Sequence, residues 1–185
     1  MRSFIAIDLP GRIKGEIEKI QNLLKNQGLN CRWKRRDNFH LTLKFLGEIT
    51  NEQAELIKKE LVLPVGDFSP FTLSITGLGA FPNTKNVRIL WLGLEGELEV
   101  LNSLQSRLEK SLEELGFPRE KRKEFTPHIT IGQDFKTPFN WNKSNLDKFK
   151  FNFLVQVKEI VLMRSEQLNG KRVYTPEAVF PLSTK

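Results

Sequence analysis

The chain contains only two histidines, and each begins the same pattern of a histidine, an apolar residue, a threonine and an apolar residue. The two copies are His40-Leu41-Thr42-Leu43 and His128-Ile129-Thr130-Ile131, with the histidines 88 positions apart (128 − 40). In an extended strand, residues two positions apart share one face, so the histidine and threonine would point one way and the apolar residues toward a core. Two such strands facing each other would pair two imidazoles between two hydroxyl donors. This arrangement is typical of a site that handles phosphoesters.

A structural role is the competing interpretation of these histidines. A single histidine on a strand more often makes a structural hydrogen bond than catalyses a reaction, and threonine forms strands well by itself. The duplication favours chemistry, because a structural role does not require both histidines to carry the same partner at the same spacing. A reaction with an acid on one side and a base on the other does require it.

Length and charge limit the class of protein. A chain of 185 residues can bury a substantial core, and we expect residues 1–185 to form one domain. The formal net charge of +7, from 29 Lys and Arg against 22 Asp and Glu, favours a polyanionic partner such as nucleic acid. Many solvated surfaces are equally basic, so the charge alone does not identify that partner.

The supply of soft metal ligands is small. Cys31 is the only cysteine, so the chain forms no intramolecular disulfide and lacks the four Cys or His ligands of a structural zinc site. A catalytic zinc on two histidines and a carboxylate stays open, although the chain has no His-Glu-x-x-His motif. The segment Met1–Asp8 is too short and too soon acidic for a signal peptide, and no apolar run approaches a membrane span. We therefore expect a cytoplasmic protein with no membrane partner.

Apolar periodicity predicts strands that alternate with three helices. Helices are expected over about 11–26, 51–62 and 97–115, the second capped by Thr50 with Gln53. Strands are expected at 3–9, 30–34, 39–46, 71–76, 87–92, 126–131, 150–164 and 172–181, with loops at 77–83 and 119–124. Several neighbouring strands resemble hairpins and no strand leads into a Gly-rich phosphate loop, which favours an α+β fold over a doubly wound sheet. Two similar lobes related by an approximate two-fold axis would bring the motif strands to the cleft between them.

Beyond the two motifs, residues over nearly the whole chain resemble the 2H phosphoesterase superfamily, and within it the RNA 2′,3′-cyclic phosphodiesterases, also called 2′-5′ RNA ligases. The stretch His-Leu-Thr-Leu-Lys-Phe-Leu-Gly-Glu is highly specific, whereas a bare His-x-Thr is not. The resemblance implies a bilobal antiparallel α+β fold, both motifs in a central cleft, and no metal or cofactor requirement. The matching stretches are Arg2–Pro10, Trp33, Asn38–Glu48, Gly77–Pro82, Arg88–Gly93 and Thr126–Ile131, with a looser match at Ser165, Gly170 and Tyr174.

The resemblance also implies a reaction. RNA ends bearing a 2′,3′-cyclic phosphate, for example those of tRNA fragments, would be opened to 2′-phosphomonoesters, with His128 as the proton acceptor and His40 as the proton donor. Imidazole suits both tasks because its unperturbed pKa of about 6.5 lies near working pH. Thr42 and Thr130 would donate hydrogen bonds to the non-bridging phosphate oxygens. The residues alone leave open which histidine has which task. Reversal with a 5′-hydroxyl in place of water would give 2′-5′ ligation, and we expect a monomer.

One position departs from the family pattern. Family members usually carry an arginine five residues after the second histidine, and here that position is Gln133. An amide donates hydrogen bonds but lacks the charge and the bidentate fork of arginine. Candidate replacements are Lys44, Arg88 or a cation of the cluster 32–36, whose alternative interpretation is a solvated turn.

Three aromatic residues are further candidates for contact with the substrate. Trp33 and Phe45 could stack on a base, although most such aromatics on apolar strands belong to the core. Tyr174 could contact the cleft.

Two other functions stay open from the sequence. One is an RNA-end binding module with little turnover, which the intact histidine and threonine pairs oppose and Gln133 weakly favours. The other is a 2H phosphoesterase that acts on a small cyclic nucleotide. The basic surplus favours RNA over the small nucleotide.

Overall fold

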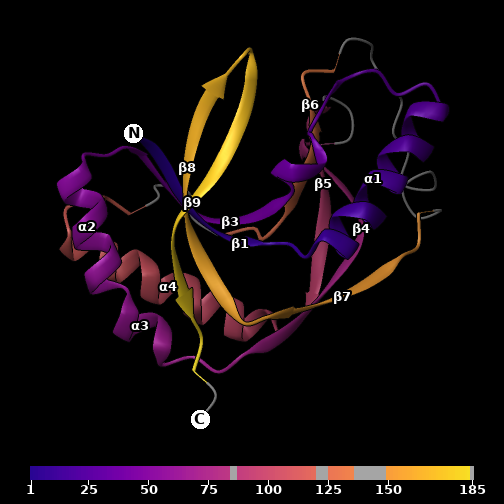
Figure 1. The fold of residues 1–185 in the computed structure, drawn as a ribbon. Coiled ribbons are helices and arrows are strands. Elements are labelled where there is room, and N and C mark those ends of the chain that lie inside the picture. The colour runs from indigo at the N-terminus through magenta and orange to yellow at the C-terminus, as the bar shows by residue number, and fades with distance from the viewer. Residues whose placement is uncertain (84–86, 120–124, 136–148, 184–185) are drawn as a thin grey trace.

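The structure, a computed structural model, describes residues 1–83, 87–119, 125–135 and 149–183. Within this part of the chain, two antiparallel β-sheets lie side by side and helices pack around them, which makes an α+β fold with a two-lobed layout (Figure 1). No helix of the described residues is long and apolar enough to cross a membrane.

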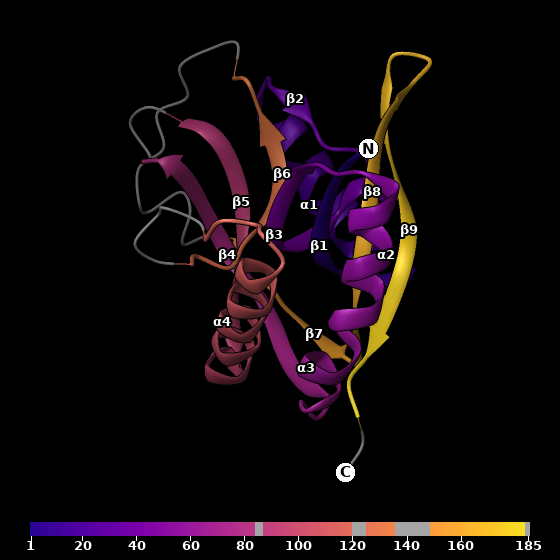
Figure 2. The same cartoon turned by 90° about the vertical axis from the view of Figure 1, so that its left-hand side faces the viewer.

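Each sheet contains or adjoins one of the two motifs. The first sheet has the strand order β3-β1-β8-β9, with β1 at Arg2–Asp8, β3 at His40–Glu48, β8 at Glu159–Leu168 and β9 at Lys171–Pro181. The second has the order β2-β6-β5-β4-β7, with β2 at Arg32–Trp33, β4 at Phe71–Pro82, β5 at Val87–Gly96, β6 at Ile129–Gln133 and β7 at Asn152–Val157. The β8–β9 hairpin extends beyond the rest of its sheet (Figures 1 and 2). The first histidine opens β3, and the second directly precedes β6.

The helices form where apolar residues recur every three or four positions. Four buried isoleucine and leucine residues form one stripe along α1: Ile13, Ile17, Ile20 and Leu24. The predicted capping box is present, because the Thr50 hydroxyl accepts from the Gln53 amide at 3.2 Å and the Gln53 side chain accepts from the Thr50 amide at 2.9 Å. The helices are α1 at Gly11–Asn26, α2 at Asn51–Glu60, α3 at Val62–Gly66 and α4 at Leu98–Glu114, with a short 3₁₀ turn at Arg36–Asn38.

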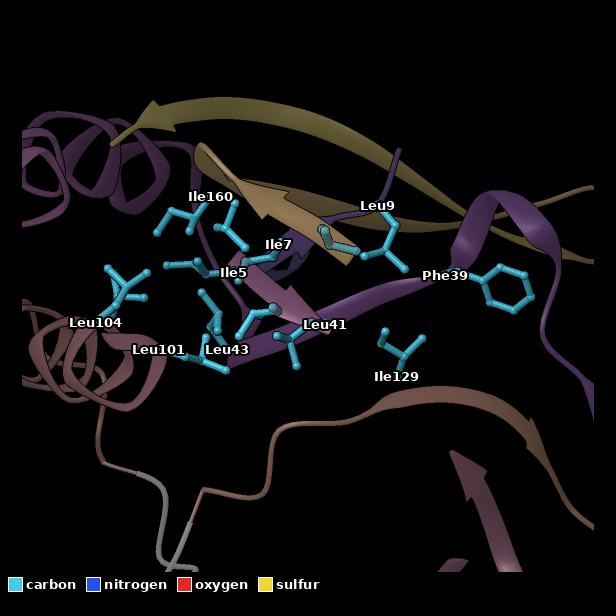
Figure 3. Close-up of a cluster of buried hydrophobic side chains, with 14 of the residues drawn as sticks. Ile5, Ile7, Leu9, Phe39, Leu41, Leu43, Leu101, Leu104, Ile129 and Ile160 are labelled. Atoms are coloured by element: carbon cyan, nitrogen blue, oxygen red, sulfur yellow. The ribbon is translucent and has the colours of Figure 1, made fainter. Parts of the chain in front are cut away.

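Each sheet is covered by helices on its core side. The Gln21 side chain of α1 donates to the carbonyl of Ile131 in the second sheet at 2.8 Å. The Gln105 side chain of α4 donates to the carbonyl of Leu43 in the first sheet at 3.5 Å. One apolar cluster lies between the sheets and the helices. Figure 3 shows side chains of β1, β3, β6, β8 and α4 meeting there. This continuous core supports the proposal that residues 1–185 form one domain.

Several predicted boundaries differ from the structure. The strand predicted at 150–164 is two strands in different sheets, because β7 pairs with β4 while β8 pairs with β1 and β9, and the chain changes sheet at Lys158. Most of the loop predicted at 77–83 continues β4, which stays paired with β5 as far as Pro82. The helix predicted at 51–62 ends at Glu60, and the strand predicted at 126–131 begins only at Ile129. Most of the loop predicted at 119–124 lies outside the described residues.

Candidate active site

The two motif strands place their residues as alternation predicts. The four apolar residues that follow the histidines and threonines are buried in the common core, with exposed fractions of 0–3%: Leu41, Leu43, Ile129 and Ile131. The two histidines and two threonines lie on the opposite faces and line one cavity of about 370 Å³. The structure thus brings together His40, Thr42, His128 and Thr130, which stand far apart in the sequence.

This cavity, here called the cleft, has a basic and aromatic lining. No acidic residue of the described chain lines it, which makes it suited to an anion. Besides the four motif residues, the lining consists of the cations Arg2, Arg32, Lys34 and Arg172, the rings of Phe4, Phe45 and Tyr174, and the small or polar residues Ser3, Asn38, Gly47, Gln133 and Ser165.

Both histidines are held in the same way by the backbone. The Nδ1 atom of His40 lies 3.0 Å from the carbonyl oxygen of Asn38, and that of His128 lies 2.7 Å from the carbonyl oxygen of Thr126. A carbonyl oxygen only accepts, so Nδ1 is the protonated nitrogen in each neutral ring. Proton exchange with a ligand is thereby assigned to Nε2. In His40 that atom lies 2.9 Å from the hydroxyl oxygen of Thr42.

The His40 ring is enclosed by aromatic neighbours. Its centroid lies 4.7 Å from that of Phe4 and 5.2 Å from that of Tyr174. The pKa of His40 is lowered to about 4, mainly by burial; the Asn38 carbonyl and Asp8 oppose this shift, and the charges of Lys34 and Lys14 contribute to it. At pH 7, His40 is therefore neutral.

A β-bulge follows the motif in each half of the chain. On β3, Thr42 pairs with Ala6 and Lys44 with Ile5, so Leu43 is an extra residue. On β6, Thr130 pairs with Trp91 and Gly132 with Leu90, so Ile131 is the extra residue. Both bulges lie three residues after the histidine and reverse the alternation that follows. The residue five positions after each histidine consequently returns to the cleft: these residues are Phe45 and Gln133.

The bulge on β3 removes Lys44 from the cleft, contrary to the expectation from sequence. Its side chain is 5% exposed, and its ammonium lies 2.6 Å from the Glu109 carboxylate and 2.6 Å from the Pro118 carbonyl oxygen. Phe45 takes the outward position instead and is 65% exposed at the cleft. A strict two-residue period cannot anticipate this exchange, because the period breaks at the bulge.

Two other candidates also lie off the cleft. Trp33 pairs with Gly132 across β2 and β6 and packs against the apolar core, with the Lys25 ammonium 5.4 Å from its ring centroid. Arg88 is exposed on β5, where its carbonyl accepts from the Asp134 amide at 3.2 Å. Neither residue lines the cleft. Gln133 and Tyr174 do line it, and their contact with a substrate stays a prediction.

A guanidinium reaches the cleft beside Gln133 from the neighbouring strand. Arg32 is the cross-strand partner of Gln133, and its Nε and Nη2 atoms lie 2.8 Å and 2.7 Å from one carboxylate oxygen of Asp134. Asp134 has a φ of 57°, the left-handed region, and follows the last residue of β6. Of the cluster 32–36, Arg32 and Lys34 line the cleft, and Arg35 and Arg36 do not.

Several residues of the cleft were not predicted from the sequence. Strand alternation offered a signal for two of them, because Arg172 lies two residues before Tyr174 and Arg2 two residues before Phe4 on their strands. Asn38 gave no such signal. Its buried side-chain amide donates to the Arg172 carbonyl at 3.0 Å and so ties the turn before His40 to β9.

Metal ligands do not gather in the described part of the chain. No group of three His, Cys, Asp or Glu side chains there is arranged to hold a metal ion. The cleft residues supply hydroxyl, imidazole, amide, ammonium and guanidinium groups, which together suit a phosphate.

A known family matches both halves of the chain. The family described as LigT like phosphoesterase matches residues 7–91 and again residues 92–174, and each match contains one His-x-Thr motif. The chain belongs to the LigT-like phosphoesterase family. This family lies within the 2H phosphoesterase superfamily.

Similar proteins cover between about three quarters and nearly all of the chain. The RNA 2′,3′-cyclic phosphodiesterase of Methanothermobacter thermautotrophicus is 31% identical over 98% of this chain and 99% of its own length. That of Thermotoga maritima is 36% identical over 77% of this chain and 75% of its own. The crystal structure of E. coli LigT complexed with 3′-AMP is 29% identical, with a TM-score of 0.80 over 99% of this chain and 98% of that one. The two-lobed α+β fold and the phosphoesterase family thus agree with the expectation from sequence.

Proposed function

We propose that this protein hydrolyses RNA 2′,3′-cyclic phosphate ends to 2′-phosphomonoesters by acid and base catalysis with two histidines and without a metal. The observation that carries the proposal is the pair of carbonyl-anchored imidazoles in one cation-lined cleft, each beside a threonine. The relatives named RNA 2′,3′-cyclic phosphodiesterase support RNA as the substrate.

The proposed reaction is an in-line displacement at phosphorus. His128 Nε2 accepts a proton from water as the water oxygen bonds to phosphorus. The bond from phosphorus to the ribose 3′-oxygen breaks, and His40 Nε2 donates a proton to that oxygen. Thr42 and Thr130 donate hydrogen bonds to the non-bridging oxygens, where negative charge accumulates. Each proton transfer of this kind is typically worth about 10²–10⁴-fold in rate.

The enclosed position of His40 adds a condition to this scheme. The pKa of about 4 leaves His40 neutral at pH 7, whereas a proton donor must be protonated. A phosphate anion bound beside the ring favours the charged imidazole and raises its pKa. His40 therefore takes up its proton together with the substrate.

The same cleft supports the reverse reaction. With a 5′-hydroxyl in place of water and a 2′,3′-cyclic phosphate end, the attack would form a 2′-5′ linkage through the same groups. Ligation, a monomeric state, a cytoplasmic location and tRNA fragments as natural substrates belong to this proposal. Size-exclusion chromatography tests the monomer directly.

The decisive test is the product formed from oligonucleotides that end in a 2′,3′-cyclic phosphate. We expect the 2′-phosphate in excess chelator, with no gain on adding divalent ions. A 3′-phosphate product would mean that the ribose 2′-oxygen leaves and not the 3′-oxygen. Loss of activity in chelator, restored by one divalent ion, would refute the metal-free mechanism. Tight binding without turnover would support the RNA-end binding module instead.

A further inference from the structure

The cations of the cleft are not equally neutralised. Arg32 is paired with Asp134 through two of its nitrogens. Lys34 and Arg172 have no ion-pair partner within the described residues, and the one side-chain contact of Arg172 there is a hydrogen bond to the Ser165 hydroxyl at 3.4 Å. Unpaired cations in a concave site favour a bound anion.

Lys34 and Arg172 come from opposite sides of the cleft, and backbone bonds hold both. The Lys34 amide donates to the Ile131 carbonyl at 2.9 Å, and its carbonyl accepts from the Gln21 side chain at 2.9 Å, which fixes it to the second sheet. Arg172 lies on β9 of the first sheet, and its carbonyl accepts from the Asn38 side chain. The second sheet thus presents the unpaired cation Lys34, and the first presents Arg172 together with Arg2, which also lines the cleft and has no ion pair within the described residues.

These charges are close enough to affect one another. Burial lowers the pKa of Lys34, and the charges of Arg32 and then Arg172 lower it further, while the charge of Asp134 raises it. An anion placed among the three cations would relieve this repulsion. The reacting phosphate has its own donors in Thr42 and Thr130.

We propose that Lys34 and Arg172, with Arg32 held by Asp134, form a second phosphate subsite that binds the phosphodiester preceding the terminal nucleotide of the RNA. The inference rests on the proposed function, because the terminal cyclic phosphate occupies the histidine pair. A mononucleoside cyclic phosphate fills only the reacting site, whereas an RNA end fills both. The subsite would therefore make the enzyme prefer an RNA end to a small cyclic nucleotide.

Three substrates test the subsite: a nucleoside 2′,3′-cyclic phosphate, a dinucleotide with the same end and a phosphodiester linkage, and that dinucleotide with an uncharged methylphosphonate linkage. We expect the charged dinucleotide to have the highest kcat/KM, by about tenfold or more. The advantage should fall as salt rises, because contacts to phosphate release counterions.

Variants assign the preference to residues. Lys34→Met and Arg172→Met should each reduce kcat/KM more for the charged dinucleotide than for the methylphosphonate, and lower the salt slope by about 1. Lys34→Arg and Arg172→Lys should keep part of the preference because they keep the charge. Lys110→Met, an exposed cation on α4, is the matched control and should leave the ratios unchanged. Thermal midpoints check that each variant folds.

The results distinguish failure of the second phosphate subsite from failure of the proposed hydrolytic function. If the wild-type enzyme treats the three substrates alike, or if each variant lowers all three by the same factor, the second subsite is refuted and the cations serve the reacting phosphate. If none of the three is hydrolysed, the proposed function fails. Calorimetric binding of dinucleotides ending in a 2′-phosphate, with charged and uncharged linkages, still tests the subsite in that case. Equal affinities would refute it.

Discussion

The imidazole of His40 packs against the rings of Phe4 and Tyr174, which also contact each other, whereas that of His128 lies against Phe81 and Trp91, at centroid distances of 5.0 Å and 6.1 Å. The two motifs share a residue pattern, a carbonyl contact at Nδ1 and a bulge three residues later. Their surroundings nevertheless differ, and burial lowers the pKa of His40. Two copies of one motif can thus be adapted to different proton-transfer tasks by the side chains around them.

Loss of either imidazole should have the largest effect. We expect His40→Ala and His128→Ala each to lower kcat by about 10²–10⁴-fold, because one proton transfer loses its catalyst. Both side chains face the cleft, so the thermal midpoint should move little. Single-turnover hydrolysis and thermal unfolding measure the two quantities. Unfolding of either variant, or turnover near that of the wild type, would instead favour a structural role.

A sulfur-substituted substrate tests which histidine is the proton donor. A cyclic phosphate with sulfur in place of the leaving 3′-oxygen needs little help from a proton donor, because a thiolate leaves readily. We expect it to restore a large part of the activity of His40→Ala and little of that of His128→Ala. Rescue of His128→Ala instead would exchange the roles of the two histidines.

Lys44→Met, directly after the bulge at Leu43, should strongly destabilise the fold. It leaves the Glu109 carboxylate buried without its cation, a loss of about 3–5 kcal/mol for a buried pair. Chemical unfolding measures the loss. The double variant Lys44→Met with Glu109→Leu should regain most of that stability, because no unpaired charge remains. A double variant as unstable as the single one would contradict this account of the pair.

The pH dependence of stability should report the enclosure of His40. The unfolded chain takes up a proton on this residue near pH 6.5 and the folded chain only near pH 4, so stability falls as pH falls through that window. The slope attributable to His40 is at most about 1.4 kcal/mol per pH unit. Urea unfolding of the wild type and of His40→Asn between pH 4 and 7 isolates it. Parallel curves for the two proteins would refute the lowered pKa.

Phe45 and Gln133 are equivalent positions after the two bulges, and the first should matter more. If Phe45 stacks on a base, Phe45→Ala should weaken substrate binding by about 1–3 kcal/mol, which would appear as a higher KM. Phe45→Trp should restore binding, and an abasic ribose cyclic phosphate should be insensitive to both changes. Leu63→Ala, at an exposed apolar residue of α3, is the control. An equal loss on the abasic substrate would rule out stacking.

Gln133→Arg should have the smallest effect. A new cation near the phosphate should lower KM and steepen its dependence on salt while leaving kcat nearly unchanged, because ground and transition states gain alike. Arg32 already brings a guanidinium to this edge of the cleft, so we expect a gain of only a few-fold. An unchanged KM at low salt would mean that Arg32 or another cation already has this role.

Local sequence patterns were sufficient to predict many of the helices and strands of the fold. The three long helices, the capping box at Thr50 and most strands followed from apolar periodicity and turn residues. The strand predicted at 150–164 failed because its apolar run is continuous while its hydrogen-bonding partners change at Lys158. Periodicity reports which residues are apolar, and it does not report which strand will be the neighbour.

The order of residues along the chain is sufficient to predict the two His-x-Thr units, their alternation with buried residues and the basic character of the protein. The pairing of distant strands, in contrast, turns Lys44 inward, brings Phe45 to the cleft and places Arg172 at the same cavity as Lys34. The physical reason is that a bulge or a contact between sheets depends on backbone pairing with distant strands. Such pairing leaves little trace in the residues next to it along the chain.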